Sequence, residues 1–141
     1  MKQRILIVAC LVVVMALLWN FSPMPLFVAI PYDVFRSAHQ KRKLQSRQDY
    51  PEIAARCVML ARSVTDNGIS IDVTDQRVPE TLRSLGPRSI FASSNQVTLE
   101  FHGAFDHYGY RVRQSDKNPK EWSIFWYTEQ GERLLTTISH D

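Results

Sequence analysis

Residues 5–19 read Ile-Leu-Ile-Val-Ala-Cys-Leu-Val-Val-Val-Met-Ala-Leu-Leu-Trp, and none of these side chains is charged. No polar stripe interrupts the run, as it would in the amphipathic helix of a globular protein. A helix through residues 5–21 would be about 25 Å long, close to the hydrocarbon thickness of a bilayer. The sequence therefore predicts a single transmembrane helix that contacts membrane lipid through residues 5–21.

The residues around this run bear on whether it stays attached to the chain. Lys2 and Arg4 precede it, and a cleaved secretory signal has the same basic start and apolar centre. A cleavage site also needs small residues, whereas residues 20–25 read Asn-Phe-Ser-Pro-Met-Pro. We therefore expect an uncleaved membrane anchor over residues 1–30, with a cleaved signal as the alternative.

Charge is distributed unevenly over the 141 residues. The formal net charge of the chain is +3. Residues 49–141 are net acidic, with ten basic and thirteen acidic side chains, whereas residues 31–48 are net basic, with five basic residues and one acidic residue. Nucleic-acid binding requires clustered lysine and arginine on the folded part, so no nucleic-acid partner is expected. We interpret residues 31–48 as a basic linker that is either simply solvated or suited to anionic lipid headgroups, and residues 49–141 as a small folded domain.

Basic residues lie on both sides of the predicted anchor. Lys2 and Arg4 favour an amino terminus inside the cell, which would place the domain outside the cytoplasm. The basic residues of the linker favour the opposite orientation. Because the first pair directly precedes the apolar run, we expect the domain to be extracytoplasmic.

A helix is expected over residues 50–66. Asp49 is positioned as its cap and Pro51 suits its first turn. Its apolar residues recur at helical spacing, which places on one face Ile53, Cys57, Leu60, Ala61 and Val64. The two cysteines, Cys10 and Cys57, match neither a disulfide framework nor a thiolate metal motif, so Cys57 is expected in the core.

Alternation of apolar and polar residues predicts a series of short strands later in the chain, at residues 89–92, 97–102, 108–113, 122–128 and 133–138. Residues 69–73 read as a short strand or an extended connection, and residues 78–87 as a short helix. Tight connections between successive strands favour an antiparallel meander. The expected fold class is α+β, with the helix over residues 50–66 packed on a four- to five-stranded antiparallel meander.

One predicted hairpin turn concentrates polar and aromatic side chains. It contains His102, Asp106, His107 and Tyr108, and Glu100 shares a strand face with His102 because the two are two residues apart. Imidazole and carboxylate groups suit zinc or another transition metal, although no established ligand spacing is matched. A structural turn is the simpler interpretation, and a metal site formed by Glu100, His102, Asp106 and His107 is the alternative.

A second cluster, residues 122–127, is rich in aromatic residues on both faces of a predicted strand. Core packing is one interpretation of this cluster, and a partner-binding patch is the functional alternative. The binding residues considered from sequence are His102, Asp106, His107, Tyr108, Trp126 and Tyr127.

Motifs of several enzyme classes are missing from the sequence. It contains no phosphate-binding glycine loop, no paired-carboxylate motif, no dinucleotide fingerprint and no nucleophile placed for His107, so we expect no cofactor and no enzymatic activity. The sequence predicts a single-pass membrane-anchored module that binds or assembles with a protein partner. A metal-binding or metal-dependent hydrolase domain is the alternative.

Overall fold

The computed structural model describes residues 24–65, 67–102 and 106–140; for residues 24–33 and His102 only the backbone is described. The chain divides into two compact units, and Val34–Asp141 is the unit that holds the sheet. The predicted anchor, residues 5–21, lies outside the described residues. Within the described ranges, no helix combines the length and apolar character that crossing a membrane requires.

Three helices are described: α2 (Met24–Gln45), α3 (Tyr50–Arg62) and α4 (Glu80–Arg83). The helix predicted over residues 50–66 is confirmed as α3, although it ends earlier, at Arg62. Asp49 occupies the N-cap position as expected, but its carboxylate makes no capping hydrogen bond and instead accepts one from Arg47 Nε at 2.7 Å. Arg47 therefore competes successfully with the helix amides for this carboxylate.

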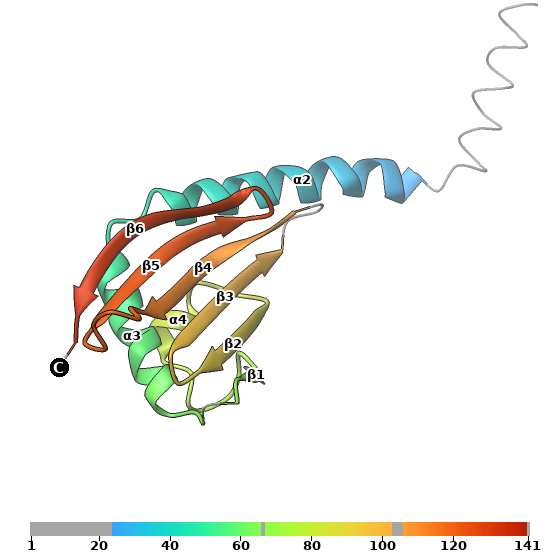
Figure 1. Cartoon of the computed structure of the whole chain (residues 1–141). Coiled ribbons are helices and arrows are strands. Elements are labelled where there is room, and N and C mark those ends of the chain that lie inside the picture. Colours follow the sequence, from blue (N-terminus) through green and yellow to red (C-terminus); the bar gives the residue numbers. More distant parts are fainter. Residues whose placement is uncertain (1–23, 66, 103–105, 141) are drawn as a thin grey trace, which may run out of the picture. The chain divides into compact units, whose positions relative to one another are not determined.

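One antiparallel sheet contains all the described strands in chain order (Figure 1). Their bounds are β1 (Ile69–Ile71), β2 (Ser89–Ser93), β3 (Gln96–His102), β4 (His107–Gln114), β5 (Glu121–Thr128) and β6 (Gly131–Ser139). The predicted α+β meander is confirmed, but the sheet has six strands instead of four to five. The additional strand is β1, which pairs with β2 and places Ile71 opposite Ile90 in the core.

The core lies between one face of the sheet and α3, which contacts β2 through β6. Figure 1 shows α3 and α4 on the same side of the sheet. Alternate strand residues point to this side and are buried, including Leu99, Tyr110 and Trp122. Cys57 of α3 is fully buried, as expected, and burial raises the pKa of its thiol, so it is a packing residue and not a nucleophile.

The last turn of α2 is held against this core by two tyrosines. Leu44 is buried, its carbonyl oxygen accepts a hydrogen bond from Tyr110 Oη at 2.6 Å, and the carbonyl of Gln45 accepts one from Tyr50 Oη at 2.8 Å. The last carbonyls of a helix have no partner within the helix, and these hydroxyls donate to two of them. Residues 31–48, predicted to be a linker, therefore contribute Leu44 to the core.

Candidate functional site

The face of the sheet opposite α3 carries exposed apolar and charged side chains. Cross-strand register aligns Phe91, Thr98, Arg111, Phe125 and Leu134 in one row across β2 to β6. Phe91 is 45% exposed and Leu134 is 55% exposed, although both are large apolar residues. We call this surface the open face. It comprises this row, the neighbouring row of Glu100, Gly109, Tyr127 and Glu132, and the side chain of Arg113.

Two arginines of the open face lie against aromatic rings. Arg111 Cζ is 4.8 Å from the centre of the Tyr127 ring, and Arg113 Cζ is 4.4 Å from the centre of the Phe125 ring. The Glu132 carboxylate forms a close ion pair with Arg111 and a second, longer ion pair with Arg113 Nη2 at 3.6 Å. The stacking and the shared carboxylate hold both guanidinium groups along the sheet, where a cation–π contact is worth about 0.5–1 kcal/mol at an exposed site.

Gly109 makes room for the ring of Tyr127. The two residues are cross-strand partners on β4 and β5, and a Cβ added to Gly109 would lie 2.8 Å from Tyr127 Cε1. The ring therefore covers backbone that has no side chain of its own. Burial, together with the nearby Glu100 carboxylate, raises the pKa of Tyr127 to about 12, so its hydroxyl is neutral at physiological pH.

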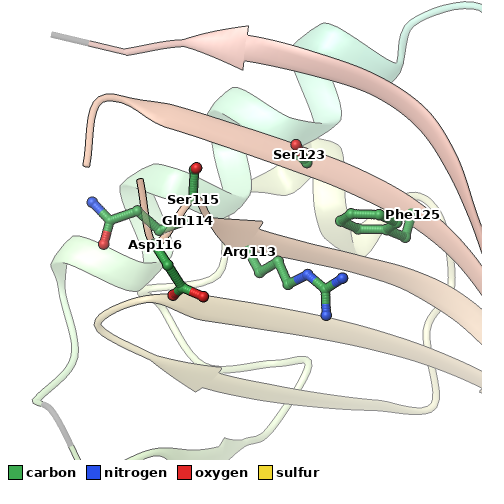
Figure 2. A pocket seen from close by; sticks show the side chains of 6 residues that line it. All are labelled: Arg113, Gln114, Ser115, Asp116, Ser123 and Phe125. Atoms are coloured by element: carbon green, nitrogen blue, oxygen red, sulfur yellow. The ribbon is translucent and has the colours of Figure 1, made fainter. Parts of the chain in front are cut away.

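A cavity of about 380 Å³ opens beside the open face at the loop that joins β4 to β5. Figure 2 shows Arg113 between Phe125 and Asp116, and Ser123 on the same strand as Phe125. The Arg113 side chain is 48% exposed, so its guanidinium can accept a further ligand besides Glu132. The cavity therefore offers one planar cation and one aromatic surface, together with hydroxyl and carboxylate groups from Ser115, Ser123 and Asp116.

The predicted metal ligands are brought together only in part. His107 is the first residue of β4, and its Nδ1 lies 2.9 Å from Glu100 Oε1. Ser89 donates a hydrogen bond to the other carboxylate oxygen, Glu100 Oε2, at 2.7 Å. His102 is the backbone partner of His107, and its side chain lies outside the described part of the chain. Among the described residues, no three histidine, cysteine, aspartate or glutamate side chains gather as a metal site requires.

Asp106 is bound to α2. Lys41 Nζ lies 2.6 Å from Asp106 Oδ2, and both side chains are partly exposed, at 31% and 39%. The same ammonium is 5.3 Å from the centre of the Tyr108 ring. Asp106 therefore has a structural role, because its ion pair with Lys41 joins the residue directly before β4 to α2.

Two of the predicted binding residues, Tyr108 and Trp126, lie on the buried side of the sheet. Tyr108 is fully buried and Trp126 is 4% exposed, and their ring centres are 5.6 Å apart. The Trp126 indole N–H has no acceptor among the described residues, and the side chain lines a second cavity of about 380 Å³ with Lys41 and Arg133. Of the two aromatics singled out on β5, only Tyr127 belongs to the open face.

Phe91, Arg111, Arg113 and Leu134 were not predicted as site residues. Each occupies the outward position in an alternating strand, so the signal was present in the sequence. Which outward residues form one surface depends on the register of five strands. Phe91 and Leu134, which are 43 positions apart in the chain, share one row only after those strands pair.

Comparison of the chain with protein-family models, with curated proteins and with solved structures finds no match.

Proposed function

We propose that the chain is a single-pass membrane-anchored module that binds a protein partner on the open face of its sheet. The anchor is residues 5–21, whose uncharged apolar run has the length of a short membrane span. The basic pair Lys2 and Arg4 before this run favours an extracytoplasmic domain. The folded domain then presents its partner-binding surface next to the membrane.

The observation that carries this proposal is the exposure of large apolar side chains on the sheet face that α3 does not cover. Phe91 and Leu134 stand at opposite ends of a row that also contains Phe125. Exposed apolar surface of this kind is costly in water and marks interaction sites. Tyrosine and arginine, which the open face also contains, are enriched among the residues that dominate binding energy.

The chemistry of the open face also defines the kind of partner. Phe91 and Leu134 require apolar side chains opposite them. Arg113 is half-exposed and its ion pair with Glu132 is long, so its guanidinium can bind a further carboxylate in two-point geometry. We therefore expect a protein segment that combines apolar residues with at least one aspartate or glutamate.

The proposal is tested by removing the apolar ends of the row. Full-length chains with Phe91→Ser or Leu134→Ser are expected to retain about a tenth or less of the partner in affinity purification from native membranes, since losing an apolar interface residue that binds the partner costs about 2 kcal/mol of binding free energy. The matched control is Met59→Ser, because Met59 is 52% exposed but lies on α3. If all three variants retain the same amount of partner and are as stable as the natural chain, the open face is not the binding surface.

A further inference from the structure

The outward side of α2 carries cations that have no carboxylate partner among the described residues. Arg36, Arg42 and Lys43 are exposed, and no ion pair involves them in the part of the chain that the structure describes. Phe35 is 76% exposed and lies on the same side, because residues three, four and seven apart share a helix face. This surface, Phe35 with Arg36, Arg42 and Lys43, is called the basic face of α2.

The opposite side of α2 is fastened to the sheet. Tyr108 Oη is 3.5 Å from the carbonyl oxygen of Ser37, Lys41 pairs with Asp106, and Leu44 is buried and accepts the hydrogen bond from Tyr110. These contacts recur along one side of the helix from Ser37 to Leu44. The helix is therefore held in one rotation, and its basic face is presented outward as a fixed surface.

We propose that the basic face of α2 binds anionic lipid headgroups, so that the domain rests on the membrane in a defined orientation. An exposed phenylalanine among arginine and lysine is the arrangement by which interfacial helices combine apolar insertion with attraction to anionic lipid. The inference rests on the membrane anchoring proposed above, which brings residues 34–45 close to a bilayer. Residues 49–141 are net acidic, which disfavours a nucleic acid lying against this domain.

The lipid contact can be tested by the chemical reactivity of Lys43 in the natural full-length chain. It lies about 14 Å from Val34 along the helix, so a helix standing upright would keep Lys43 beyond the screening length of about 8 Å. The chain is placed in nanodiscs of phosphatidylcholine with or without phosphatidylglycerol, and acetylation of each lysine by a water-soluble reagent is followed by mass spectrometry. Acetylation of Lys43 is expected to be slower by about threefold or more when phosphatidylglycerol is present, and high salt should remove the difference.

Two controls separate lipid contact from other effects. Lys117, an exposed residue of the loop between β4 and β5, should react equally in both kinds of disc. Arg36→Gln with Arg42→Gln should abolish most of the protection of Lys43, whereas Arg56→Gln with Arg77→Gln, which removes two charges elsewhere, should leave it unchanged.

The outcomes distinguish this inference from the anchor on which it rests. Equal labelling of Lys43 in both discs, with the chain still co-eluting with them, would overturn the lipid contact alone. A chain that co-elutes with neither disc would overturn the anchor and the lipid contact together. Protection of Lys43 by soluble RNA but not by phosphatidylglycerol would assign the basic face to nucleic acid and contradict the proposal.

Discussion

Gly109 shows most directly how single residues shape the open face. A Cβ at this position would lie 1.9 Å from the carbonyl oxygen of Leu99 and 2.8 Å from Tyr127 Cε1. The first neighbour is backbone and cannot move without disturbing the pairing of β3 with β4. The absence of a side chain thus permits both the close approach of β3 and the position of the Tyr127 ring, against which Arg111 lies.

We expect Gly109→Ala to lower the free energy of unfolding by about 3 kcal/mol, because the added methyl group forces the backbone to shift. Chemical denaturation of the purified chain measures this change. Gly86→Ala is the control: Gly86 has φ +71° but open space around it, so alanine there should cost only about 1–2 kcal/mol. An alanine variant at position 109 as stable as the natural chain would contradict the described approach of β3 to β4.

At the level of elements, residue periodicity was sufficient to predict most helices and strands. The helical spacing of Ile53, Cys57 and Leu60 predicted α3, and the alternation of Val97, Leu99 and Phe101 predicted β3, because each pattern matches the geometry of the element that it forms. The strand β1 was uncertain in sequence, since three residues carry little pattern and depend on β2 for partners. The N-cap position of Asp49 was predicted correctly, but its carboxylate does not cap the helix because Arg47, two residues away, binds it.

The candidate site was less predictable than the elements. The composition of residues 102–108 predicts a cluster, but of its described side chains only His107 meets a predicted ligand, Glu100, whereas Asp106 pairs with Lys41 of α2. The open face requires the register of β2 to β6, which arises from contacts between strands distant in sequence. Alternation identifies the outward residues of each strand, and only pairing shows which of them are neighbours.

The strands β4 and β5 give the domain a distinctive dependence on alkaline pH. Burial raises the pKa of Tyr108 and Tyr110 on β4, and raises that of Tyr127 on β5 to about 12. Tyrosines in the unfolded chain ionise near pH 10, so the unfolded state loses protons first. Stability should therefore be retained below about pH 10 and fall as the pH rises towards 12.

Tyr127→Phe isolates the contribution of one residue to this dependence. The variant should lose stability less steeply between about pH 10 and 12, and its tyrosinate absorbance should lack one ionisation near pH 12. Denaturation curves and ultraviolet titration measure the two quantities. An unchanged slope, together with loss of an ionisation near pH 10 instead of pH 12, would show that Tyr127 is not buried as the geometry describes.

The whole chain combines an uncharged apolar run at residues 5–21, a helix with a basic outward side and a sheet with one uncovered face. We propose a different ligand for each: bilayer hydrocarbon for the apolar run, anionic headgroups for the basic face of α2, and a protein for the open face. The domain would then hold its partner at a fixed orientation to the membrane. The central claim is that the open face binds this partner.

Site-specific photocrosslinking in native membranes tests that claim most directly. With p-benzoylphenylalanine in place of Phe91, we predict a crosslink to one protein through a segment that contains apolar residues and an aspartate or glutamate, and its yield should fall about tenfold with Leu134→Ser. The same probe in place of Met59 should give no such product. Identical products from positions 91 and 59, or a product from position 91 that Leu134→Ser leaves undiminished, would contradict a partner bound on the open face.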